Sequence, residues 1–145
     1  MKLHIREDPA AQEVEVTIRC RQTDDEVLAL AALLRTRERK LTGVREGETF
    51  LLDAGEVLYI DTVDKKTFFY TGDGVYETPL KLYELEERLA ALDFFRAGKS
   101  LVVNFGQIQS LRPEFGGRLR LTMSSGETLF VSRQYVPTVR RKLGI

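Results

Sequence analysis

Residues 67–78 read TFFYTGDGVYET, two short apolar runs separated by Gly72-Asp73-Gly74. Each run is rich in aromatic and β-branched residues, which favour strands, and glycine supplies the positive φ angles of a tight reversal. This stretch therefore predicts a β-hairpin. A second hairpin is predicted where residues 118–123 alternate polar and apolar, turn at Ser124-Ser125-Gly126 and return through residues 128–131. Two such hairpins indicate a mainly β chain with antiparallel sheets.

The rest of the second half of the chain contains shorter patterns that predict strands, helices and loops. A strand is predicted at Val57–Asp61, and a helix is predicted after Thr78 as its cap, with Pro79 at its first position. Its buried stripe is Leu82, Leu85, Leu89 and Leu92. Residues 94–104 predict a loop with Arg96 and Lys99 at its centre, held between apolar anchors, and residues 132–143 predict a loop that runs into a short helix.

The first forty residues predict a strand and a helix. Apolar and polar residues alternate over Val14–Cys20, which is typical of a half-buried strand, and Thr23 to Glu26 form a capping box. The helix stripe that follows is Val27, Leu30, Ala31 and Leu34, and the charged residues 35–40 are expected to form a solvated connector. One strand and one helix are too small to hold a hydrophobic core alone. We therefore expect this unit to dock on the rest of the chain or on a second subunit.

Composition limits the class of protein. The 145 residues have a net charge of zero and one cysteine, Cys20, which excludes an internal disulfide or a multi-cysteine metal site. Because the chain lacks an apolar run of membrane-spanning length and an N-terminal signal sequence, we expect a cytoplasmic protein. Residues 96–145 carry nine Lys and Arg against two Asp and Glu, whereas residues 51–95 carry four against ten. The basic final third favours a polyanionic partner.

The sequence offers few residues that could act as a catalytic nucleophile, base or metal ligand. The single histidine, His4, lies beside the N-terminus, and Cys20 falls in a strand pattern that is typical of a buried, unreactive thiol. Gly98-Lys99-Ser100 resembles the end of a phosphate-binding loop, but the glycine that this motif needs is replaced by Asp93. We therefore predict no catalytic residue, no metal and no cofactor.

Five segments in a fixed order carry a resemblance to a known family. They are Val57–Thr62, Asp64–Phe68, Leu82–Leu89, residues 94–104 (with Phe94-Phe95-Arg96, Lys99-Ser100 and Val103-Asn104) and Val131–Val136. Together they resemble the LytTR family of DNA-binding domains over residues 45–145. The resemblance implies an elongated fold of small antiparallel β-sheets with short helices. Residues 1–44 are similar to the strand–helix extension of stand-alone LytTR regulators.

The resemblance also implies a function. LytTR domains regulate transcription by inserting loops into successive major grooves of direct repeats in double-stranded DNA, and a homodimer is the expected state. Carried onto this chain, the DNA-binding residues are Lys65, Lys66, Thr67, Arg96, Lys99, Ser100, Arg133 and Gln134. Phe94, Phe95, Leu101 and Val103 are expected to hold the loops rigid. The input signal of such a regulator is expected to enter through a partner protein of unknown identity.

One alternative stays open: a protein-interaction module of the same fold that docks an acidic partner and has lost DNA binding.

Overall fold

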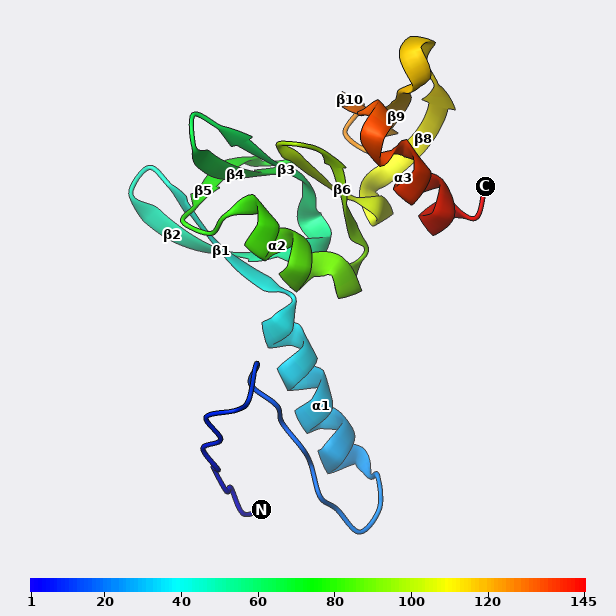
Figure 1. Ribbon diagram of the computed structural model, residues 1–145. Coiled ribbons are helices and arrows are strands. Elements are labelled where there is room, and N and C mark those ends of the chain that lie inside the picture. Colours follow the sequence, from blue (N-terminus) through cyan, green and yellow to red (C-terminus); the bar gives the residue numbers. More distant parts are fainter. The chain divides into compact units, whose positions relative to one another are not determined.

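The computed structural model describes the backbone of all 145 residues and the side chains of all but residues 36–38. Packing divides the chain into two units, Met1–Arg35 and Thr36–Ile145. Figure 1 follows the elements along the chain, and the helix α1, Asp25–Glu38, crosses the boundary between the units. No helix in the described part of the chain is both long enough and apolar enough to cross a bilayer.

The first unit departs from the predicted strand and helix cap. Residues 14–20 form no strand, and Val14 and Val16 are 93% and 60% exposed. The physical reason is that a strand needs a partner, and no backbone hydrogen bond joins these residues to another segment of the described chain. Cys20, predicted to be buried, is exposed. The helix is capped by Asp24 rather than Thr23, since the Asp24 carboxylate accepts a hydrogen bond from the amide of Val27 at 3.1 Å.

The helix α1 also runs further than its apolar stripe suggested. Its backbone continues to Glu38, through most of the residues that were expected to form a connector. Within the first unit, Val27, Leu30 and Ala31 are half-buried, whereas Leu34, the last residue of the stripe, is 39% exposed. The stripe is therefore only partly covered by the unit to which it belongs.

The second unit contains two antiparallel sheets, as the fold class predicts. The larger has the strand order β2-β1-β5-β4-β3-β7-β6 and the smaller has the order β10-β9-β8. The strands of the larger sheet are β1 (Lys40–Arg45), β2 (Glu48–Asp53), β3 (Val57–Val63), β4 (Lys66–Thr71), β5 (Gly74–Thr78), β6 (Phe94–Gly98) and β7 (Leu101–Asn104). Those of the smaller are β8 (Ile108–Pro113), β9 (Leu119–Met123) and β10 (Thr128–Val131). Both predicted hairpins are confirmed, as β4–β5 and β9–β10.

Two short α-helices and five single-turn 3₁₀ helices complete the second unit. The α-helices are α2 (Leu82–Leu89) and α3 (Val136–Leu143), and the 3₁₀ turns are η1 (Ala54–Glu56), η2 (Ala90–Leu92), η3 (Phe105–Gln107), η4 (Phe115–Gly117) and η5 (Arg133–Tyr135). The predicted start of α2 was wrong. Thr78 ends β5 and is buried, and its hydroxyl accepts from the amide of Leu80 in a local turn, so the helix begins only at Leu82.

Neighbouring residues of the central strands face two different cores. Val57, Ile60 and Val102 pack in the core that contains the α2 stripe. Tyr59 and Val103 pack in a second core, with residues of β9, β10 and α3. From Tyr59 to Ile60 and from Val102 to Val103 this division follows from the two-residue period of a strand. The register shift between Val57 and Tyr59 breaks that period, so Val57 faces the same core as Ile60. Of the predicted packing residues, Phe94, Phe95 and Val103 are buried and Leu101 is partly buried, which confirms a packed base beneath the β6–β7 turn.

Candidate nucleic-acid interface

The first predicted DNA-contacting segment is the tip of the β3–β4 hairpin. Val63 pairs with Lys66, so Asp64 and Lys65 alone form the turn, with φ angles of 51° and 66°. Two consecutive positive φ angles define a type I′ turn, which matches the twist of the flanking strands. Asp64, Lys65 and Lys66 are exposed, so both lysine ammonium groups are open to a phosphate.

Thr67 does not belong to this exposed tip, contrary to the sequence prediction. It is 4% exposed, and it lies in β4 between Thr62 of β3 and Thr78 of β5. It shares the inward face of β4 with buried Phe69, two residues along. Since its hydroxyl cannot reach a duplex without unpacking the sheet, we leave Thr67 out of the interface.

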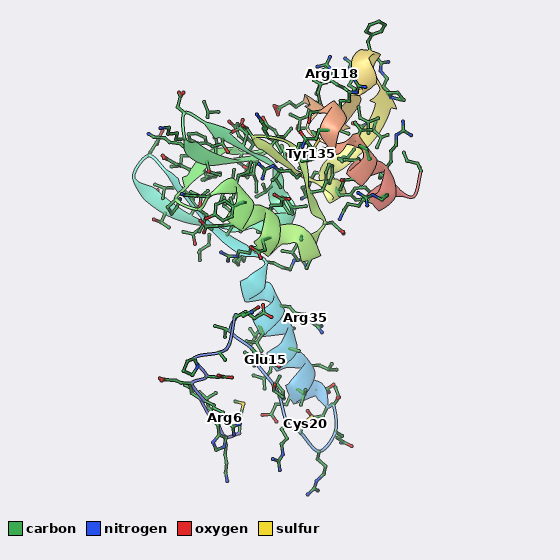
Figure 2. The ribbon with its side chains drawn as sticks, viewed as in Figure 1. Arg6, Glu15, Cys20, Arg35, Arg118 and Tyr135 are labelled. Atoms are coloured by element: carbon green, nitrogen blue, oxygen red, sulfur yellow. The ribbon has the colours of Figure 1, made fainter. Side chains whose placement is uncertain are left out.

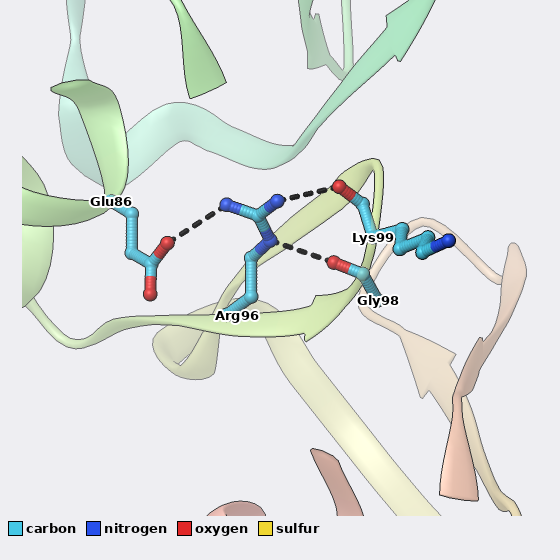
Figure 3. A network of polar contacts seen from close by, with 4 residues as sticks. All are labelled: Glu86, Arg96, Gly98 and Lys99. Carbon is cyan, nitrogen blue, oxygen red and sulfur yellow. Dashed lines mark hydrogen bonds and ion pairs between the residues drawn. The ribbon is translucent and has the colours of Figure 1, made fainter. Parts of the chain in front are cut away.

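Lys99 and Ser100 form the second segment, the exposed β6–β7 turn. Arg96, which was expected in the same loop, lies instead in β6, and Figure 3 shows what its guanidinium does. It donates to the carbonyl oxygen of Gly98 at 2.7 Å, to that of Lys99 at 2.5 Å and to the Glu86 carboxylate at 2.8 Å. The Lys99 side chain extends away from this network. Arg96 is therefore a positioning residue that fixes the turn presenting Lys99.

Arg133 and Gln134 form the third segment, in the turn η5 that follows β10. The preceding residue, Ser132, donates its amide hydrogen to the carbonyl oxygen of Ala97 in β6 at 2.9 Å. Arg133 is exposed, and its side chain lies over Gly117, where a Cβ atom would come within 3.4 Å of the arginine Cγ. Gly117 also has a φ of +78°, which favours glycine. The aliphatic part of the Arg133 side chain therefore packs over the backbone of Gly117, where no side chain stands in its way.

Strand register brings the three segments together. Asp61 pairs with Leu101, and the amide of Thr62 donates to the carbonyl oxygen of Ser100 at 3.0 Å, so the β6–β7 turn lies beside the end of β3 that leads into the β3–β4 turn. The Ser132–Ala97 hydrogen bond anchors η5 two residues before Lys99. Lys65 and Lys99 therefore emerge at the same end of β3 and β6, and Arg133 follows a residue that is hydrogen-bonded to this part of β6. These three residues are here called the cationic tips.

Sequence reasoning missed the residues that hold these tips. Glu86 contacts Arg96 and Gly117 contacts Arg133, each from a distant part of the chain. Ser132, next to Arg133, is anchored to Ala97 only through its backbone amide. Only the burial of Thr67 had a sequence signal, because it stands two residues from Phe69 in an alternating strand.

Comparison with known proteins identifies the family. A family model described as the LytTr DNA-binding domain matches residues 47–144, which include all three cationic tips. The chain belongs to the LytTR DNA-binding domain family. That family is a class of DNA-binding domains of transcriptional regulators rather than a class of enzymes.

Individual relatives agree with this assignment. The LytTr DNA-binding domain of a protein from Bacillus cereus has a TM-score of 0.71 and 26% identity, covering 74% of this chain and 98% of its own. An uncharacterised HTH-type transcriptional regulator from Staphylococcus aureus strain MSSA476 is 24% identical over 100% of this chain and 99% of its own length. The sensory transduction protein LytT of Enterococcus faecalis is 25% identical over 69% of this chain and 41% of its own length.

A polar cluster links the two sheets of this LytTR domain. The hydroxyl of Tyr59 in β3 donates to the Glu127 carboxylate, in the β9–β10 turn, at 2.8 Å, and the Tyr59 ring stacks on Tyr70 at 4.3 Å between centroids. Burial, followed by the hydrogen bond to Asp61, raises the pKa of Tyr70 to about 12. Burial and the contact with Glu127 also raise the pKa of Tyr59. Desolvation raises the pKa of Asp61, and its buried Oδ1 atom has no hydrogen-bond partner among the described residues.

These tyrosines predict a loss of stability in alkali. An unfolded tyrosine ionises near pH 10, whereas Tyr59 and Tyr70 stay neutral to higher pH in the folded protein. The unfolded state therefore loses protons first, and the free energy of unfolding should fall as the pH rises from about 10 to about 12. Urea midpoints measured between pH 8 and 11.5 should decrease less for the Tyr59→Phe/Tyr70→Phe variant. Equal pH slopes for the two proteins would contradict this assignment.

The positioning role of Arg96 makes a separate prediction. Replacing Arg96 by glutamine removes donors to the Gly98 and Lys99 carbonyl groups, so the β6–β7 turn should loosen and DNA affinity should fall roughly fivefold, about 1 kcal/mol. Because the guanidinium makes its contacts within the protein, the slope of affinity against salt should stay unchanged. A titration of binding against salt checks this, and a slope reduced by one phosphate contact would show that Arg96 meets DNA directly.

Proposed function

We propose that this LytTR protein is a sequence-specific transcriptional regulator that acts in the cytoplasm and binds double-stranded DNA as a homodimer. Its cationic tips would enter successive major grooves of a direct-repeat site. The observation that supports this most strongly is the grouping of the tips: register places Lys65 and Lys99 at the same end of β3 and β6, and the Ser132–Ala97 hydrogen bond anchors the residue before Arg133 to β6.

The shape of the tips suits this role. Strands of a hairpin lie about 4.8 Å apart, and a major groove is about 12 Å wide, so a two-stranded ribbon ending in a two-residue turn fits within it. Three turns held close together by these contacts can meet one duplex without rearrangement of the sheet. The packed base beneath the β6–β7 turn keeps the tips ordered before binding, which lowers the entropy cost of association.

The residues at and beside the cationic tips would make two kinds of contact with DNA. Lys65 and Lys66 have flexible stems and point charges, which suit phosphate oxygens and carry no sequence information. Arg133 has a planar fork that can donate to both acceptors of guanine, with Gln134 beside it able to pair with adenine. Lys99 suits guanine or phosphate, and the Ser100 hydroxyl can donate to either.

Selection from a random duplex library, followed by footprinting, tests the proposal. We expect enrichment of two repeats spaced by about one helical turn, roughly 34–36 Å, with preference over competitor DNA of about a thousandfold or more. The dependence of affinity on salt should correspond to several phosphate contacts. Failure to retain any duplex at low salt would contradict the proposal and favour the alternative of a protein-docking module.

Lys65 provides a sharper prediction for the non-specific part of binding. Replacing Lys65 by alanine should weaken binding to all sequences alike and reduce the salt slope by about one, since one phosphate contact is lost. The matched control is Lys81→Ala, which removes an exposed lysine at the start of α2, outside the cationic tips. Filter binding at a series of salt concentrations measures both variants. A loss confined to one operator sequence would show that Lys65 reads a base.

A further inference from the structure

Within the described chain, the segment of residues 13–21 has no backbone partner in another segment and leaves much of its apolar face exposed, with Val14 at 93%, Val16 at 60% and Ile18 at 36%. It reads EVEVTIRCR, in which Val14, Val16, Ile18 and Cys20 alternate with charged or hydroxyl side chains. Figure 2 shows Glu15 and Cys20 on this segment, which precedes α1. In the described part of the chain no backbone hydrogen bond joins it to another segment, although its alternation is that of a strand.

The charges of this segment are complementary to the same segment read in reverse. If two copies pair antiparallel about Thr17, Glu13 faces Arg21 and Glu15 faces Arg19, and symmetry repeats each pair. On the opposite face Val14 meets Cys20 and Val16 meets Ile18. Opposite charges directly across a strand pair are stabilising, and so are apolar pairs. Every charged residue of the segment therefore finds an opposite charge.

Other registers lose this match. Centring the pair on Val16 or Ile18 leaves one Glu–Arg pairing, with its symmetry copy, instead of two. A shift by one residue sets apolar side chains against charged ones, because the two faces of a strand alternate. A parallel pair in register sets glutamate against glutamate and arginine against arginine, which is destabilising.

We propose that residues 13–21 form an antiparallel two-stranded ribbon with the same residues of a second copy of this chain. This ribbon would be the interface of the homodimer described under the proposed function. The inference rests on that function only for the dimeric state. A two-stranded ribbon is only marginally stable alone, so its apolar face needs cover. The half-buried stripe of α1, Val27, Leu30 and Ala31, belongs to the same unit and offers apolar surface for this purpose.

Charge reversal tests the register. One variant carries Glu13→Arg and Glu15→Arg, and the other carries Arg19→Glu and Arg21→Glu. Each variant alone sets like charges against each other at all four pairs, so its dimer dissociation constant should rise at least tenfold. In an equimolar mixture of the two variants every pair is again complementary. Sedimentation of the full chain without DNA should then show dimers at the same protein concentration at which the wild type forms them. The matched control is Arg140→Glu/Arg141→Glu, which has the same net charge as the second variant. With the first variant it makes only two of the four complementary pairs, so it should not restore that variant to wild-type dimer levels.

A cross-link tests the axis of the pair. Thr17 faces itself in this register, so Thr17→Cys in a Cys20→Ser background should form a disulfide-linked dimer on mild oxidation. The wild-type Cys20 faces Val14 and should not link, because the two Cys20 residues stand six positions apart, roughly 20 Å.

Either of two results overturns the proposal: a wild-type protein that is monomeric at tens of micromolar, or a dimer that neither charge variant weakens. Because these measurements contain no DNA, they can fail while the duplex selection succeeds, and the reverse also holds. The segment is exposed, so its substitutions leave the cores of the second unit intact.

Discussion

Replacing Arg133 by alanine is expected to cost about 1–3 kcal/mol of specific binding and to relax the preference at one base position of the site. The reason is the place of this residue: its side chain is exposed at the start of η5, and the preceding residue, Ser132, is anchored to β6 by its hydrogen bond to Ala97. Competition between the selected operator and single-base variants measures the loss. The discrimination between bases should shrink at one position and remain at the others.

Two variants make the Arg133 experiment specific. Arg133→Lys keeps the charge but loses the planar fork, so it should retain non-specific affinity while losing the base preference. Arg140→Ala removes an exposed cation of α3 outside the cationic tips and should leave the preference unchanged. An equal loss on every sequence for Arg133→Ala would show that Arg133 contacts phosphate alone.

The second large effect is expected at Asn104, which is 4% exposed at the end of β7. Its side-chain amide donates to the carbonyl oxygen of Val57 at 2.8 Å, and its Oδ1 accepts from the amide of Gly106 at 3.0 Å. Asn104→Ala leaves both backbone groups without a partner near the first residue of β3, where Val57 is fully buried. An unsatisfied buried group such as the Val57 carbonyl costs about 1–3 kcal/mol, and loss of the contact with the exposed Gly106 adds about 1 kcal/mol or less, so we expect a total loss of about 3 kcal/mol.

Urea unfolding checks the Asn104 prediction. The control is Gln107→Ala, whose side chain also reaches the η1 turn by donating to the carbonyl oxygen of Gly55 at 2.7 Å but is more exposed. Water can replace that contact, so the control should lose about 1 kcal/mol or less. Comparable losses for the two variants would show that Asn104 is not the central link between the η1 and η3 turns.

The hairpins were predictable because their signals are local. Gly72-Asp73-Gly74 and Ser124-Ser125-Gly126 mark turns, and the flanking residues alternate with the two-residue period of strands. The start of α2 was predicted too early, because Thr78 and Pro79 give the same local signal whether a helix begins there or a strand ends. Only the pairing of Thr78 with Thr67 of β4 decides between these outcomes.

The candidate site was predictable to the extent that its residues are exposed turn residues. The structure confirms that Lys65, Lys99 and Arg133 are exposed turn residues, and their contact with DNA stays a prediction. The contacts of Arg96 were not predicted, because its ion-pair partner Glu86 stands ten residues earlier on α2. The same limit explains the segment of residues 14–20. Its alternation favours a strand, but the sequence alone does not say which chain supplies the partner.

If Arg133 reads a base as proposed, Gly117 gives the domain a means of changing which sequence it recognises without altering any group that contacts DNA. A larger residue there would have to adopt an uncommon backbone angle and would press on the aliphatic stem of Arg133. The guanidinium would then be re-aimed along the groove while its chemistry stayed the same. Divergence of operator preference among proteins of this type could therefore arise at a position that no footprint would reveal.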